Sequence, residues 1–129
     1  MALYRGDEVR FTINLTAPGF SMADDDFEIE VSSSRGGSIK GYKTPPAGED
    51  PLDVIIFSET VETTVPAEEP EGEPTVESTT TWYVIADTSK LNAGELKVIG
   101  TAYVPDAHAN DGVRRQTAVN KDLGILQEP

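Results

Sequence analysis

The feature that most constrains this chain is a period-two alternation of apolar and polar residues. In residues 9–15 polar or charged positions separate the apolar side chains, which are Val9, Phe11, Ile13 and Leu15. Residues 27–31 repeat the pattern with Phe27, Ile29 and Val31. Successive side chains of an extended strand point to opposite faces, whereas one face of a helix recurs about every 3.6 residues. The alternation therefore predicts half-buried β-strands.

The rest of the chain is also strand-like. Its many Val, Ile and Thr residues pack well on pleated strands and lose rotamer freedom in helices. Further short strands are expected at residues 39–43, 52–57, 79–86, 95–104, 113–119 and, docking last, 123–126. Because residues 52–57 are apolar on both faces, they predict a central strand that is covered on both sides. Residues 59–65 are expected either to continue this strand or to form the first arm of a hairpin.

These segments leave room for at most one helical turn, near residues 89–92. Seven to eight short strands in a chain of 129 residues predict an all-β fold. A chain of this length suits one hydrophobic core. The sequence therefore predicts a single antiparallel β-sandwich domain over residues 1–129.

Residues 66–77 differ from the strands around them. Prolines alternate here with glutamates, and Val76 is the one large apolar residue among Pro66, Pro70, Pro74, Glu68, Glu69, Glu71, Glu73 and Glu77. Repulsion between like charges and fixed proline torsions extend such a segment and keep it solvated. We predict a long mobile acidic loop or the tip of a hairpin. Its glutamates Glu68, Glu69, Glu71 and Glu73 are candidates for contact with a partner.

The composition narrows the classes of partner. With 23 acidic and 10 basic residues, the formal net charge is -13. A surface this negative repels phosphate backbones and anionic lipids, so we expect no nucleic-acid or membrane partner. There is no cysteine, which excludes disulfides and thiolate chemistry. The first residues resemble no signal peptide, which predicts a protein kept inside a cell or released by another route, unless a signal has been removed.

A search for catalytic and metal-binding groups yields only weak candidates. His108, the one histidine, lies in a polar turn and is expected to be solvent-exposed. Asp24 and Asp26, or Asp106 and Asp111, offer the oxygen ligands that hard cations prefer. Neighbouring carboxylates on an extended chain point in different directions, so solvated loops are the favoured interpretation. We therefore predict no catalytic residue, no cofactor and a protein that is not an enzyme.

Two adjacent pairs of residues are further candidates for interaction. Trp82 and Tyr83 are neighbours in a predicted strand and should face opposite sides. One is expected in the core, and the other is a candidate for stacking on a sugar or a partner. Arg114 and Arg115 are candidates because they place two basic groups on a late strand of an acidic protein.

The second half of the chain resembles a known group of modules. Residues 82–98 read Trp-Tyr-Val-Ile-Ala-Asp-Thr-Ser-Lys-Leu-Asn-Ala-Gly-Glu-Leu-Lys-Val, which is similar to the strand, turn and strand of immunoglobulin-like modules in phage structural proteins. Residues 102–106 and 111–115 are similar to the continuation in phages and prophages of gut Bacteroidales. Residues 6–15 resemble the first strand of baseplate and tail accessory modules. The acidic segment 66–77 lies outside this pattern.

This resemblance implies an immunoglobulin-like β-sandwich that serves as a virion structural subunit, attached to a capsid, tail or baseplate. It implies other virion proteins and further copies of the chain as partners, and no catalytic residue. The expected location is the virion, and the host cytoplasm before assembly. The termini, before Val9 and after Val119, are expected to become ordered on neighbours. The alternative is a cell-surface or secreted adhesion module that binds a glycan or a protein.

Overall fold

The computed structural model describes residues 3–44, 53–67, 70 and 72–129. Within these residues it contains eight strands and one short 3-10 helix, η1 (Thr88–Lys90). The strands are β1 (Leu3–Tyr4), β2 (Glu8–Ile13), β3 (Phe27–Ser33), β4 (Ser38–Tyr42), β5 (Val54–Val65), β6 (Thr75–Asp87), β7 (Gly94–Pro105) and β8 (Val113–Gln127). No helix in the described part of the chain is long and apolar enough to cross a membrane.

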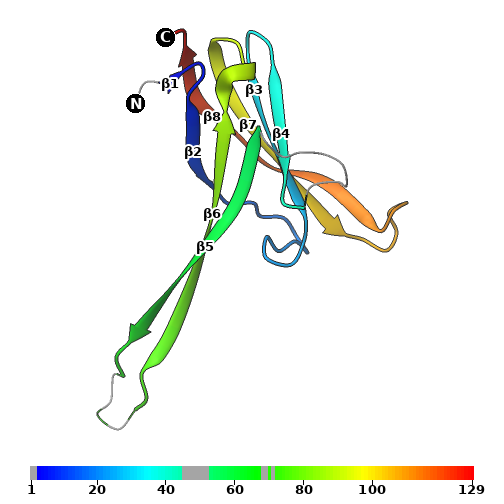
Figure 1. The fold of residues 1–129 in the computed structure, drawn as a ribbon. Coiled ribbons are helices and arrows are strands. Elements are labelled where there is room, and N and C mark those ends of the chain that lie inside the picture. The colour runs from blue at the N-terminus through cyan, green and yellow to red at the C-terminus, as the bar shows by residue number, and fades with distance from the viewer. Residues whose placement is uncertain (1–2, 45–52, 68–69, 71) are drawn as a thin grey trace.

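The strands form two sheets, one of them curled into a half-barrel. The five-stranded sheet has the order β1-β8-β7-β3-β4, and the three-stranded sheet has the order β2-β6-β5. Neighbouring strands are antiparallel in every pair except β1–β8, which is parallel. Pairing of β1 with β8 brings the two ends of the chain to the same end of the body (Figure 1).

The core lies between the facing sides of the two sheets. Phe27, Ile29 and Val31 of β3 have no exposed area, as the alternation in the sequence predicts. The ring of Phe27 meets Phe20 and Trp82 edge-to-face, with centroid distances of 6.3 and 5.4 Å. Edge-to-face pairs are a favourable aromatic geometry. Phe27 therefore joins β3 of one sheet to β6 of the other.

The two sheets approach most closely where β4 passes β5. Gly41 of β4 faces Val54 of β5, and a Cβ atom at Gly41 would lie 2.4 Å from the Val54 carbonyl oxygen. No real Cβ atom tolerates such a distance to backbone. The absence of a side chain at Gly41 is therefore what lets the two sheets meet at this edge.

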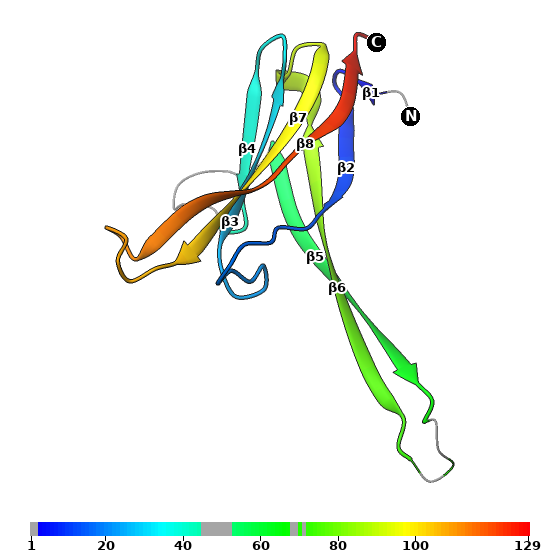
Figure 2. The same cartoon turned by 180° about the vertical axis from the view of Figure 1, so that it is seen from behind.

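Strands β5 and β6 extend well beyond the body as a two-stranded hairpin (Figures 1 and 2). Strand β2 pairs with β6 only through Trp82–Asp87, so the distal part of the hairpin has no third strand among the described residues. We call this part, Glu59–Val65 and Thr75–Thr81, the arm. Its side chains are exposed, apart from partial shielding of Val65 and Thr81.

The structure confirms the all-β prediction, the alternating segments and the helical turn near residues 89–92. Two predictions about individual strands were wrong. Strand β5 is an edge strand rather than a central one, and the side chain of Ile55 is 45% exposed. Its apolar outer face belongs to the surface of the three-stranded sheet, and no second sheet covers it in the described chain. Residues 123–126 continue β8 instead of forming a separate strand, since a register shift between Leu96 and Lys97 keeps β8 paired with β7.

The predicted loop at residues 66–77 is also shorter than expected. Strand β6 begins at Thr75, so Thr75, Val76 and Glu77 belong to the ladder with β5. The β-branched residues at 75–76 favour a strand, and the body provides the ladder that they extend. The alternative of a hairpin tip fits this connection. Glu68, Glu69 and Glu71 lie outside the described residues.

Candidate interaction surface

The acidic loop around Asp24 and Asp26 encloses a cation of its own. The ammonium group of Lys43 donates hydrogen bonds to the carbonyl oxygens of Met22, Ala23 and Asp25 at 2.8, 2.9 and 2.9 Å. The Asp26 carboxylate accepts a hydrogen bond from the Thr44 hydroxyl at 2.8 Å. Converging carbonyl oxygens are the kind of ligands that a hard cation would use. Here the lysine already occupies that position.

The second pair of metal candidates is occupied by arginines. Arg114 Nε lies 3.4 Å from Asp106, and Arg115 Nη1 lies 3.0 Å from Asp111. Hydrogen bonds from Arg115 and from the Val113 backbone lower the pKa of Asp111, and the same pairing raises the pKa of Arg115. The two arginines therefore tie the β7–β8 turn together, which sequence reasoning missed. In the described residues no three His, Asp or Glu side chains converge as a metal site would require.

Trp82 and Tyr83 point to opposite sides of β6, as expected for neighbours on a strand. Trp82 packs against the core and Phe27. Tyr83 lies on the outer face, where its ring stacks on Phe57 at 5.3 Å. The guanidinium of Arg10 lies over both rings, 4.5 Å from the Tyr83 centroid and 5.2 Å from that of Phe57. Tyr83 is thus already stacked on its own neighbours.

These aromatic residues belong to a larger outer patch. Pairing across the three-stranded sheet places Arg10, Ile85 and Ile55 in one row and Tyr83 and Phe57 in the next. We define the outer patch as Ile55, Phe57, Tyr83 and Ile85. The sequence signal for this patch was the two-sided apolar run in β5, which was misread as burial on both faces.

The arm and the connection between its strands carry only acidic charge. Residues 59–81 contain no Lys or Arg and seven glutamates, which are Glu59, Glu62, Glu68, Glu69, Glu71, Glu73 and Glu77. Arg10, from the body, lies 3.4 Å from Glu59. On the arm itself Val61 and Val76 are each 62% exposed, and the hydroxyls of Thr60 and Thr80 are hydrogen-bonded at 2.9 Å. The arm therefore combines an acidic, threonine-rich surface with exposed valines.

A pocket of about 420 Å³ lies where the arm leaves the body. Its walls come from the end of β2, from β6 and from β8, and include Ile13, Thr80, Thr81, Trp82, Val119 and Lys121. The Lys121 ammonium donates to the Thr12 carbonyl at 3.3 Å and lies 5.8 Å from the Phe11 ring centroid. We call this the base pocket. It adjoins the point where β2 ends and the edge of β6 becomes open.

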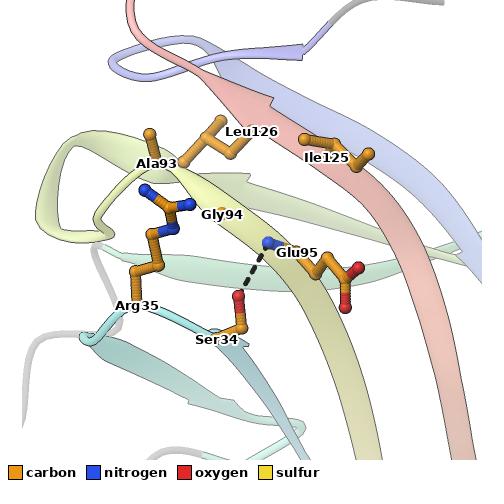
Figure 3. Close-up of a pocket in the computed structure, with 7 residues that line it drawn as sticks. All are labelled: Ser34, Arg35, Ala93, Gly94, Glu95, Ile125 and Leu126. Carbon is orange, nitrogen blue, oxygen red and sulfur yellow. Dashed lines mark hydrogen bonds between the residues drawn. The ribbon is translucent and has the colours of Figure 1, made fainter.

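A second pocket, of about 550 Å³, lies beside the end of β8, where β8 pairs with β1. Figure 3 shows the residues that line it. It is bounded by Ser34 and Arg35, by residues 93–95, and by Ile125 and Leu126. The Ser34 hydroxyl accepts a hydrogen bond from the Glu95 backbone N–H at 3.0 Å. A serine nucleophile would require a neighbouring base. His108 lies in the β7–β8 turn, and it does not line this pocket.

Comparison of the chain with protein-family models, with curated proteins and with solved structures finds no match.

Proposed function

We propose that this protein is a non-enzymatic structural subunit of a phage-like virion, attached to a capsid, tail or baseplate by protein–protein contacts. The observation that carries the proposal is the arm. It projects from the body, has no buried side chain, and contributes nothing to the hydrophobic core (Figure 2). A long ordered hairpin that does not serve the core of its own body is suited to contact with a neighbour.

The virion context rests on the resemblance of residues 82–98 to immunoglobulin-like phage modules. In this proposal the two-sheet body is an immunoglobulin-like sandwich. The protein acts in the virion, after a period in the host cytoplasm, and its partners are virion proteins and further copies of the chain. The net charge of -13 supports protein partners over nucleic acid or anionic membranes.

The test is mass spectrometry of density-purified particles from a culture that carries the gene. We expect the protein at a fixed ratio to capsid or tail proteins. In a variant with residues 60–80 replaced by Asn-Gly, a two-residue turn connects the paired residues Glu59 and Thr81. We expect this variant to fold and to be lost from particles.

The matched control places the same Asn-Gly turn in the β7–β8 hairpin in place of residues 106–112, and it should still be incorporated. Absence of the unmodified protein from particles would overturn the virion proposal. Normal incorporation of the arm variant would instead show that another surface makes the attachment.

The outer patch favours a second function, namely adhesion to a glycan or protein at a cell surface. Exposed aromatic rings are common in carbohydrate and protein binding sites. Stacking of a glycan on these rings is disfavoured, because Tyr83 and Phe57 already stack on each other and lie beneath Arg10. A glycan array with the intact protein and Tyr83→Ala tests this function. Binding that is lost in Tyr83→Ala would favour adhesion over virion assembly.

A further inference from the structure

Strand β6 has an open edge along the arm, and other open edges in the described chain lie on β2, β4, β5 and most of β8. Strand β6 pairs with β5 along all but its last residue, from Val65↔Thr75 to Val54↔Ala86. On its other side it pairs with β2 only at Trp82–Asp87. In the described chain, Thr75–Thr81 therefore present backbone N–H and C=O groups to solvent on the side where β2 has ended. Such an edge accepts an added strand through main-chain hydrogen bonds.

The base pocket marks where an added strand would begin. A strand on the open edge of β6 would continue the line of β2, with its first residue beside Ile13, Thr81 and Trp82. In recognition by strand addition, main-chain bonds provide affinity and pockets for side chains provide specificity. Strand β5 also has an outer edge, but the base pocket is lined by β2, β6 and β8 and not by β5. The β6 edge is therefore a better site than the β5 edge.

The charge of the arm identifies the kind of partner. Glu77 lies on the open strand, and Glu62 lies on β5 beside it, opposite Ser78. Neither the arm nor the connection between its strands contains a lysine or arginine. At the base, however, Lys121 lines the pocket. A matching strand would thus place an apolar side chain in the base pocket and basic side chains further along the arm.

We propose that Thr75–Thr81 of β6 binds an extended basic segment of another protein as an additional β-strand. A second copy of this chain is a poorer occupant, because it would bring a protein of net charge -13 against a segment of its own that has acidic and no basic residues. This inference rests on the assembly function proposed above, because it specifies the class of partner to which the arm attaches.

The experiment measures binding of a synthetic peptide of alternating lysine and threonine, with a leucine at each end, to the purified intact protein. Backbone amide NMR reports both affinity and hydrogen exchange. We expect slower exchange at alternate residues of Thr75–Thr81, because one strand edge bonds every second residue. Shifts are also expected at Trp82 and Ile13, which line the base pocket. Higher ionic strength should weaken binding, since the contacts are exposed.

Two control peptides separate strand addition from simple charge attraction. A peptide with glutamate in place of lysine should not bind, and a lysine peptide with methylated backbone nitrogens should lose binding although its charge is unchanged. Equal binding of the methylated peptide, or protection at the β5 edge instead of the β6 edge, would overturn the proposal. Concentration-dependent protection of Thr75–Thr81 in the protein alone would overturn it in favour of self-association.

Two matched variants test whether the acidic charge of the arm contributes to peptide binding. Glu77→Lys should weaken binding roughly three- to tenfold, because an exposed attraction becomes a repulsion. Glu95→Lys makes the same charge change on β7, at an exposed position away from the arm, and should leave binding unchanged. Near-ultraviolet circular dichroism of Trp82 checks that both variants fold. A folded Glu77→Lys protein that binds the peptide as tightly as the parent would overturn the proposal. Incorporation into virions is measured separately, so a failure of the assembly function can be told apart from a failure of strand addition.

Discussion

Substitution of Gly41 by alanine tests how the two sheets meet. The new Cβ atom would lie 2.4 Å from the Val54 carbonyl oxygen and 2.7 Å from both Val54 Cβ and Cγ1. Ordinary contact requires about 3.4 Å or more, so β4 and β5 would have to separate by roughly 1 Å. Overpacking of this kind costs about 1–3 kcal/mol of unfolding free energy. Gly41 has an ordinary backbone conformation, so the cost is steric.

The net effect also includes a gain. Glycine inside a strand is less favourable than alanine by about 0.5–1 kcal/mol. Without the clash, Gly41→Ala would therefore stabilise the protein by that amount. Because the nearest atom belongs to the backbone and cannot turn aside, the overpacking cost should lie in the upper part of its range, about 2–3 kcal/mol. We therefore expect a net loss of about 1–2.5 kcal/mol, which corresponds to a melting temperature lowered by roughly 3–10 °C in a chain of this size. Urea unfolding followed by Trp82 fluorescence measures the loss.

Gly100→Ala is the matched control within the body. Its Cβ atom would lie 3.3 Å from methyl groups of Ile29 and Leu15, which are ends of side chains that can shift. We expect a change smaller than about 1 kcal/mol. Adding Val54→Ala to Gly41→Ala should not restore stability, because the Val54 carbonyl remains in place. If Gly41→Ala were as stable as the parent, the close contact of β4 with β5 would be refuted.

Three further substitutions test individual interactions in the body. Lys43→Met removes the ammonium that binds three loop carbonyls and should lower the unfolding free energy by about 1–3 kcal/mol, with faster amide exchange in residues 21–26. Thr88→Val keeps the volume of a fully buried side chain but removes its hydroxyl. This hydroxyl donates to the Asp7 carbonyl at 2.7 Å and accepts from the Gly6 N–H at 3.0 Å. We expect urea unfolding to show an unfolding free energy lower by about 1–3 kcal/mol. Burial and a hydrogen bond to Glu28 raise the pKa of Tyr103 to about 12. As the pH rises, the phenol of Tyr103 therefore ionises in the unfolded chain before it does in the folded protein. The stability that the protonated phenol gives the folded protein is present below about pH 10 and is lost as the pH rises towards 12. Unfolding of Tyr103→Phe should therefore depend less on pH across that interval, and equal slopes for the two proteins would contradict the assignment.

The strands of the core were predictable because each of them has one buried face. In β3 the alternation of Phe27, Ile29 and Val31 with polar residues has only one arrangement that removes the apolar side chains from water. The helical turn was predictable for a local reason as well. Asp87 accepts a hydrogen bond from Ser89 N–H at 2.9 Å, which also lowers the pKa of Asp87. Such signals lie within a few residues of each other.

Features that depend on distant segments were not predictable in this way. An apolar run such as residues 54–57 reads alike in a central strand and in an edge strand with an apolar outer face. The position of β5 at the edge follows from pairing with β6, which the sequence does not reveal. Likewise, nothing in the sequence around Asp24 and Asp26 indicates that Lys43, which follows β4, will bind the carbonyl oxygens of this loop. The partners of Arg114 and Arg115 depend on the turn that closes the β7–β8 hairpin.

The arm is the most informative case, because residues 75–77 were predicted as part of a loop or hairpin tip and yet begin strand β6. A two-stranded hairpin is at best marginally stable in water, and glutamates lower its strand propensity further. Here the ladder does not have to start in the arm, because β5 and β6 are already aligned by Val54, Val84 and Ala86 in the core. Each pair beyond Ser58↔Trp82 then extends an existing ladder. Stability should therefore decrease from Glu59↔Thr81 towards Val65↔Thr75, and a strand bound to the open edge of β6 should protect most where the free arm exchanges fastest.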